Sequence, residues 1–197
     1  MVDVSHISKA AMLEAVRVSR APVIASHSST RALADHGRNL DDEQLEALKR
    51  NGGVMQTVAF SAYVKVQPPE RLAAIRELRQ QFGVTSSASL RAMPADRRAE
   101  YDRALADIER RWPRATVRDF VDHIDYAVKK IGIDHVGISS DFDGGGGVEG
   151  WDNARETFNV TLELVRRGYS EAEIAKLWGG NLLRVWRAVE RVAQQGT

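Results

Sequence analysis

Short apolar runs alternate along this chain with longer amphipathic stretches, and this alternation limits the possible folds more than any other feature. The apolar runs cover residues 2–5, 21–26, 53–60 and 135–139, and each contains β-branched residues. Strands that are separated by helices pair in parallel, because the helix returns the chain to the same end of the sheet. The sequence therefore predicts an α/β fold with a covered parallel sheet. Four strand–helix units are half of an eight-fold barrel, or most of a small open sheet.

Capping residues mark where several helices begin. Asp41 precedes a helical pattern, and Gln44 three residues later completes the signature of a capping box. Ser8 and Thr116 stand in the same position ahead of two other patterns. We therefore expect helices over residues 8–18, 41–50, 116–130, 152–167, 170–177 and 181–194.

A long insertion separates the third strand from the helix that returns the chain to the sheet. Two charged helical patterns fill residues 68–112, one from about 68 to 82 and one from about 94 to 112. They predict a helical hairpin. This hairpin could cover one end of the sheet as a lid, or lie at the surface with no part in the chemistry.

Charge and composition exclude several classes of protein. The 28 Lys and Arg residues almost balance the 27 Asp and Glu residues, so the chain lacks the concentrated basic face that nucleic-acid binding requires. With no cysteine present, a metal site must use His and carboxylate ligands. No apolar run approaches the roughly 20 residues of a transmembrane segment. The first residues lack the pattern of a signal peptide, so a cytoplasmic location is the default expectation.

Two histidines occupy matching positions in the expected sheet. His6 directly follows the first strand, and His27 directly follows the second. Because the carboxyl ends of parallel strands converge at one edge, both imidazoles would lie within reach of one metal ion. Asp3 and Ser28 are candidates for the hydrogen bond that a ligating imidazole needs on its other nitrogen. The alternative is that each histidine is an ordinary polar residue at a strand end.

Asp141 stands at the corresponding position after the fourth strand. A carboxylate there can bind a metal, or accept and return the proton of an activated water molecule. The alternative is that Asp141 only forms a turn, although Asp143, directly before the glycines, suits that role better. Phe60 and Tyr63, at the end of the third strand, are candidates to line a pocket.

Five segments, in constant order, resemble a known family. They are DVSH at 3–6, PVIASHSS at 22–29, RNLDD at 38–42, DHVGISSDFDG at 134–144 and GNLLRV at 180–185. Together they resemble the membrane (renal-type) dipeptidase family, peptidase family M19. The resemblance extends over nearly the whole chain apart from the helical insertion.

This resemblance implies an amidohydrolase-like (β/α)8 TIM barrel with a two-metal centre, usually zinc, that hydrolyses dipeptides. By position, His6 and His27 would ligate one metal. Arg38 would bind the carboxylate of the dipeptide substrate through its guanidinium. Asp141 would contact the substrate and act as the general acid and base that moves a proton from water to the leaving amine. Members are often dimers, so a homodimer is a further possibility.

The chain also departs from the family pattern. It lacks the His-x-Asp motif of the first barrel strand, the bridging Glu and one further active-site histidine. We therefore expect residues 1–197 to form only the C-terminal half of the barrel, about strands 5–8. Two hypotheses follow. The chain either supplies part of a working dipeptidase site, or is a catalytically inactive half-barrel that at most binds a metal or a partner.

The other three histidines are assigned no catalytic role. His123 lies within an expected helix and should pack or cap there, and His135 opens a strand at the end opposite the site. His36 neighbours Arg38, so a contact with substrate is possible for it alone.

Overall fold

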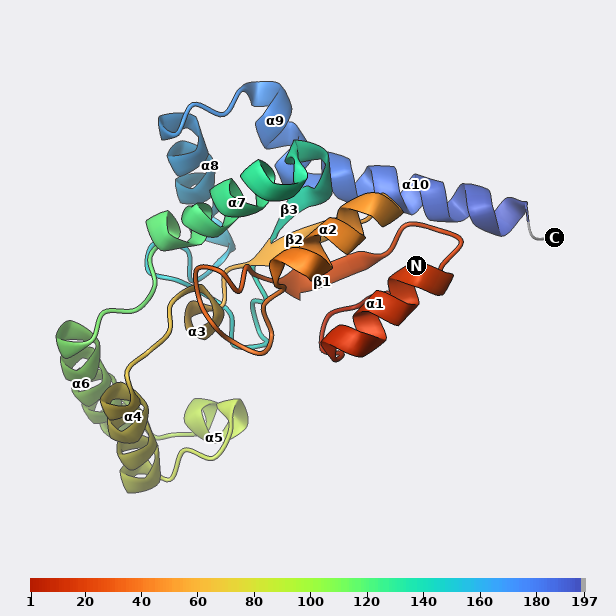
Figure 1. Ribbon diagram of the computed structural model, residues 1–197. Helices are drawn as coiled ribbons and strands as arrows, with labels where there is room; N and C mark the ends of the chain where they lie inside the picture. Colours follow the sequence, from red (N-terminus) through yellow and green to blue (C-terminus); the bar gives the residue numbers. More distant parts are fainter. Residues whose placement is uncertain (196–197) are drawn as a thin grey trace. The chain divides into compact units, whose positions relative to one another are not determined.

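The computed structural model describes residues 1–195 and divides them into two compact units (Figure 1). The larger unit contains residues 1–66 and the chain from 115 onward, and the smaller one contains residues 67–114. The smaller unit corresponds to the insertion expected from the sequence. Each unit has a hydrophobic core of its own.

A three-stranded parallel sheet forms the centre of the larger unit. Its strands are β1 (Ile24–Ser28), β2 (Val54–Val58) and β3 (Val136–Ser139), in the order β1-β2-β3. Strand β2 is buried along its whole length, as expected for the middle strand of a covered sheet. The predicted α/β class and parallel pairing are therefore confirmed.

The strand expected over residues 2–5 does not form, and this prediction is wrong. Only one parallel bridge, between Asp3 and Ile24, joins this segment to β1. The amide of Val4 donates to the carbonyl of Ile24 at 2.8 Å, but the pairing then stops. It stops because the Asp3 carboxylate accepts the Ser5 amide, and because His6 turns the chain with a left-handed φ of 69°.

Two other strand boundaries also differ from expectation. β1 extends through Ser28, so His27 lies inside the strand and does not follow it. His135 ends a short 3-10 helix (Ile133–His135) and does not open the fourth strand. Its ring Nδ1 lies 2.9 Å from the carbonyl oxygen of Gly53, a contact that keeps this histidine at the amino ends of the strands.

The helices of the larger unit pack beside one another in chain order (Figure 1). Helix α2 lies between α1 and α7, and α7 also packs beside α8. The capping boxes at Asp41–Gln44 and Thr116–Asp119 are both formed. Helix α7 buries Phe120 and Ile124 completely against the sheet. The helices of this unit are α1 (Lys9–Val18), α2 (Asp42–Asn51), α3 (Ser61–Val64), α7 (Val117–Ile131), α8 (Thr157–Arg166), α9 (Glu171–Ala175) and α10 (Asn181–Gln194).

The smaller unit contains α4 (Pro69–Phe82), α5 (Ser87–Arg91) and α6 (Ala95–Arg111). The two long helices match the two patterns seen in the sequence, and α5 is an addition between them. Leu78, Val84 and Tyr101 form the buried core of this unit. Across both units, no helix within residues 1–195 is long and apolar enough to cross a membrane.

Candidate metal and substrate site

The imidazoles of His6 and His27 meet at the carboxyl end of β1. Their Nε2 atoms lie 2.6 Å apart, and their ring centroids are separated by 4.6 Å. His6 is exposed and His27 is half-buried. The structure therefore brings together the two residues that the sequence placed at one edge of the sheet, and turns one nitrogen of each ring toward the other.

A β-bulge in β1 sets the direction of His27. Ala25 pairs with Met55 and Ser28 with Thr57, so two residues of β1 stand opposite one residue of β2. The two are Ser26 and His27. Neighbouring side chains of a regular strand point to opposite faces, whereas a bulge redirects one of them. The bulge lets the hydroxyl of Ser26 reach the imidazole of His27.

The other ring nitrogen of His27 has a partner in Ser26. Its Nδ1 lies 2.7 Å from the Ser26 Oγ, and the Ser26 hydroxyl donates to the Oδ2 of Asp3 at 2.5 Å. The sequence proposed Asp3 and Ser28 for this position. Asp3 reaches the ring only through Ser26, and the Ser28 hydroxyl instead contacts Ser5 at 3.2 Å. Ser26 was missed because strand alternation places it on the opposite face from its neighbour.

The Asp3 carboxylate is held in its ionised form by hydrogen bonds. Partial desolvation of the carboxylate would by itself raise its pKa, but the Ser26 hydroxyl and the amides of Ser5 and Ser26 together bring the pKa below its ordinary value. Those two amides donate to Oδ1 at 3.0 and 3.1 Å. A carboxylate with several donors is a stable anion, so Asp3 keeps its charge near the histidine pair.

The pKa of His27 lies below its ordinary value of 6.5. Burial is the largest cause, the positive charge of Arg38 comes next, and His6 adds to it. The negative charges of Asp141 and Asp3 oppose this shift. His27 is therefore neutral near pH 7, and neutral imidazole is the form that binds metals.

Arg38 joins the site from the loop between β1 and α2. Its Nη2 donates to the carbonyl oxygen of His27 at 3.3 Å, and its guanidinium carbon lies 5.5 Å from the centre of the Tyr63 ring. Tyr63 stacks on Phe60 with ring centroids 4.2 Å apart, and His36 contacts the Tyr63 ring at 4.5 Å. The Nε of Arg38 is buried and has no hydrogen-bond partner among residues 1–195. Unused donor capacity of this kind suits an anionic group.

Asp141 lies two residues beyond β3, in a turn that depends on glycine. Its own φ is left-handed at 55°, and its carbonyl accepts from the amides of Gly144 and Gly146 at 3.1 and 2.9 Å. A Cβ at Gly144 would collide with the Asp141 carboxylate. The glycines therefore allow the turn to close directly over Asp141.

His123 has the packing role expected of it. It is 1% exposed in α7, its Nδ1 accepts from the Thr30 amide at 3.2 Å, and its Nε2 lies 2.9 Å from the carbonyl oxygen of Val64. Burial lowers its pKa. His123 thus joins the segment after β1 to the end of α3, and does not face the other histidines.

The donor set fits part of a metal site. Two imidazoles that face each other are suitable zinc ligands, and tetrahedral zinc places such nitrogens about 3.3 Å apart, so the rings would separate slightly. Within residues 1–195, however, no group of three or more His, Cys, Asp or Glu side chains is placed to hold a metal ion. Catalytic zinc normally takes three protein ligands. For a zinc site of this kind, His6 and His27 would supply some of the ligands and not all.

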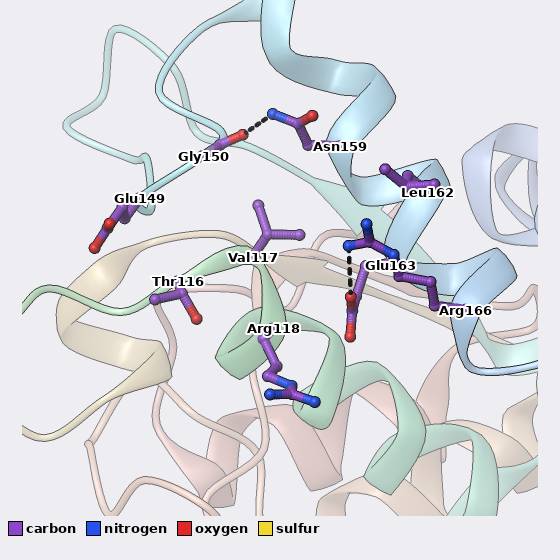
Figure 2. Close-up of a pocket in the computed structure, with 9 residues that line it drawn as sticks. All are labelled: Thr116, Val117, Arg118, Glu149, Gly150, Asn159, Leu162, Glu163 and Arg166. Atoms are coloured by element: carbon purple, nitrogen blue, oxygen red, sulfur yellow. Dashed lines mark hydrogen bonds and ion pairs between the residues drawn. The ribbon is translucent and has the colours of Figure 1, made fainter.

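Two surface hollows differ in their relation to these residues. A small one is lined by His6, Ser28 and Arg38 among others, so it opens directly beside the histidine pair. A wider one lies between the start of α7 and the length of α8 (Figure 2), where the Asn159 side chain donates to the Gly150 carbonyl at 2.7 Å. The wider hollow contains none of the four candidate residues, whereas the small one contains His6 and Arg38, so we place the site there. Asp141 lines a separate hollow with Phe142 and Trp151.

Fold and site together define an α/β protein with a histidine pair at the carboxyl ends of parallel strands. A family model described as membrane dipeptidase (Peptidase family M19) matches residues 1–197, and the chain belongs to this family. Two fungal relatives agree. Dipeptidase tcpJ of Claviceps purpurea is 34% identical over 194 residues, and dipeptidase ataJ of Aspergillus terreus is 36% identical over 194 residues.

Solved structures share the fold. The chain superimposes on the probable dipeptidase PvdM of Pseudomonas aeruginosa with a TM-score of 0.76 and 45% identity, covering 97% of this chain and 50% of that one. A metallo peptidase of Rhodobacter sphaeroides, solved with a phosphinate mimic of L-Ala-D-Ala, shares the fold at 22% identity and a TM-score of 0.67, covering 95% and 42% of the two chains.

The chain is much shorter than these relatives. Both fungal alignments include 98% of this chain, but they span only 35% of the length of tcpJ and 37% of the length of ataJ. It spans half of PvdM.

Proposed function

We propose that this chain contributes to metal-dependent hydrolysis of dipeptides. Family membership supports a dipeptidase. The observation that carries the proposal is the facing pair of Nε2 atoms of His6 and His27, 2.6 Å apart, with charged Arg38 and Asp141 near enough to shift the pKa of His27. Zinc is the metal we propose, because imidazole is among its preferred ligands.

Each residue has a distinct part in the proposed reaction. His6 and His27 hold one metal ion. Arg38 binds the carboxylate of the dipeptide through its guanidinium, whose Nε has no hydrogen-bond partner among residues 1–195. Asp141 accepts a proton from the attacking water at a carboxylate oxygen and delivers it to the nitrogen of the leaving amine. A metal held by these two histidines would supply a Lewis acid for the scissile carbonyl and lower the pKa of the water.

The fold supports the proposal that the chain corresponds to the second half of a (β/α)8 barrel. Three parallel strands with covering helices superimpose on half of the PvdM chain. Closing such a barrel would add further strands and further side chains at the same edge. The whole site would then combine the four residues with others.

A second candidate function has its own support. Only two histidines face each other here, and catalytic zinc normally takes three protein ligands. The chain by itself could therefore bind a metal without turning over substrate. We expect weak catalysis at most from the isolated chain, far below the rate of about 10 s⁻¹ that is typical of enzymes.

Hydrolysis of alanylalanine by the full chain, with and without added zinc, tests the proposal. The variants are His27→Ala and, as the matched control, His135→Ala, because His135 contacts Gly53 at the other end of the strands. We expect slow, zinc-dependent hydrolysis that His27→Ala abolishes and His135→Ala retains.

Three other outcomes of this assay would each contradict part of the proposal or favour the second candidate. Hydrolysis that His27→Ala leaves unchanged would contradict the proposed site. Zinc binding without any hydrolysis would support the second candidate. Turnover at ordinary enzymatic rates, lost in His27→Ala, would contradict the expectation that the chain needs further ligands.

A further inference from the structure

His27 has two ring nitrogens, and the structure gives each a different neighbour. Nε2 faces His6 at 2.6 Å, while Nδ1 lies 2.7 Å from the hydroxyl oxygen of Ser26. A neutral imidazole carries its proton on one nitrogen and a lone pair on the other. Only the nitrogen with the lone pair can bind a metal. The function of His27 therefore depends on which nitrogen carries the proton.

The second hydrogen-bond partner of the Ser26 hydroxyl determines which ring nitrogen of His27 carries the proton. Asp3 Oδ2 lies 2.5 Å from Ser26 Oγ, and an ionised carboxylate can only accept a hydrogen bond. The single hydroxyl proton of Ser26 is therefore directed to Asp3. The Oγ has only acceptor capacity left for His27, so Nδ1 must be the nitrogen that carries the proton. The lone pair then lies on Nε2, toward His6.

Asp3 is fixed in place for this task. Its Oδ1 accepts the backbone amides of Ser5 and Ser26, which leaves Oδ2 directed at the Ser26 hydroxyl. The amide of His27 in turn donates to the Ser5 hydroxyl at 3.0 Å. These contacts join residues 3–5 to the bulge of β1. They also explain why the pairing of the first segment is interrupted at the site.

We propose that Asp3 and Ser26 are positioning residues that hold His27 in the tautomer with a free Nε2 lone pair, directed at the metal position. The purpose of this arrangement rests on the proposed metal-dependent function, but the tautomer itself does not. Neither residue contacts the reacting atoms. Both act through His27, as groups behind a metal-ligating histidine commonly do.

Nitrogen-15 NMR of the labelled, metal-free full chain near pH 7.5 reads the tautomer directly. In the unmodified chain we expect the His27 proton on Nδ1. Ser26→Ala removes the acceptor and should leave a mixture of tautomers. Asp3→Ala frees the Ser26 hydroxyl to donate to Nδ1, so the proton should move to Nε2. Asp3 is exposed, so this substitution leaves no buried cavity.

A conservative variant and a matched control complete the experiment. Ser26→Thr keeps the hydroxyl and should restore the original tautomer. Ser29→Ala deletes a nearby hydroxyl that bonds to the Val58 carbonyl and should change nothing at His27. Zinc affinity, from competition with a chromophoric chelator, should fall about 10- to 100-fold in Ser26→Ala and recover in Ser26→Thr.

The two proposals fail in different ways. The same His27 tautomer in the unmodified chain, Ser26→Ala and Asp3→Ala would overturn the positioning role. A tautomer that follows the expected pattern in a chain that binds no zinc would support the positioning role and contradict the proposed metal function.

Discussion

The guanidinium of Arg38 and the backbone of His27 are directly joined, since Arg38 Nη2 donates to the His27 carbonyl oxygen at 3.3 Å. This contact places a permanent positive charge beside the proposed metal ligand. It also restrains Arg38 while the Tyr63 ring supports its guanidinium, 5.5 Å away. One side chain therefore has two measurable effects, on the charge of His27 and on the binding of an anionic substrate group.

Substitution of Arg38 should weaken dipeptide binding. Arg38→Ala removes a charge-assisted contact worth about 2 kcal/mol, so we expect the dissociation constant of alanylalanine to rise about 30-fold. Arg38→Lys keeps the charge but not the planar fork, and should recover only part of the loss. Calorimetric titration of the zinc-loaded chain measures this. Exposed Arg50 at the end of α2 is the control, and equal effects of Arg38→Ala and Arg50→Ala would argue against a substrate role.

The pKa of His27 should respond in opposite directions to two charge-removing substitutions. Asp141 raises this pKa and Arg38 lowers it. Asp141→Asn should therefore lower the pKa of His27 further, and Arg38→Met should raise it. NMR titration of the metal-free chain follows both. If the His27 pKa is unchanged in both variants, then neither charge lies near enough to His27 to share a site with it.

Stability should fall on the acid side because of His123. Burial lowers the pKa of His123 below its ordinary value of 6.5. As the pH falls below 6.5, His123 binds a proton in the unfolded chain but not in the folded one, so the free energy of unfolding decreases. Above this pH the contribution of His123 is fully present. Chemical denaturation near pH 7.5 and near pH 5.5 measures the difference.

Two variants connect that pH dependence to one residue. His123→Gln removes the titrating group, so the free energy of unfolding should decrease less between pH 7.5 and pH 5.5. His135→Gln should show the same decrease as the unmodified chain. His123→Ala should cost about 3 kcal/mol, because it leaves a cavity and removes the hydrogen bonds to Thr30 and Val64. If the free energy of unfolding decreases as much in His123→Gln as in the unmodified chain, groups other than His123 cause the pH dependence.

Elements with strong local signals could be predicted from the sequence. The parallel sheet followed from the alternation of apolar runs and helices, and the capping box of Asp41 and Gln44 followed from spacing alone. The packing of His123 followed from its place in an amphipathic helix. In each case, residues close together in the chain determine the structure.

The details of the site depend on contacts between distant segments, and these could not be predicted. A strand over residues 2–5 was expected, but the Asp3 side chain takes backbone amides that a strand would use. The bulge at Ser26 and His27 depends on the register between β1 and β2, which no local pattern records. For the same reason Ser26 was missed. The catalytic and binding roles of His6, His27, Arg38 and Asp141 remain predictions.

The affinity of the full chain for zinc, measured by competition titration, tests the central claim most directly. If His6 and His27 share one metal ion through their facing Nε2 atoms, the chain binds one zinc, and His6→Ala and His27→Ala each weaken binding strongly. His135→Ala should bind as the unmodified chain does. Zinc binding that survives both His6→Ala and His27→Ala would contradict the claim, and so would a chain that binds no zinc at all.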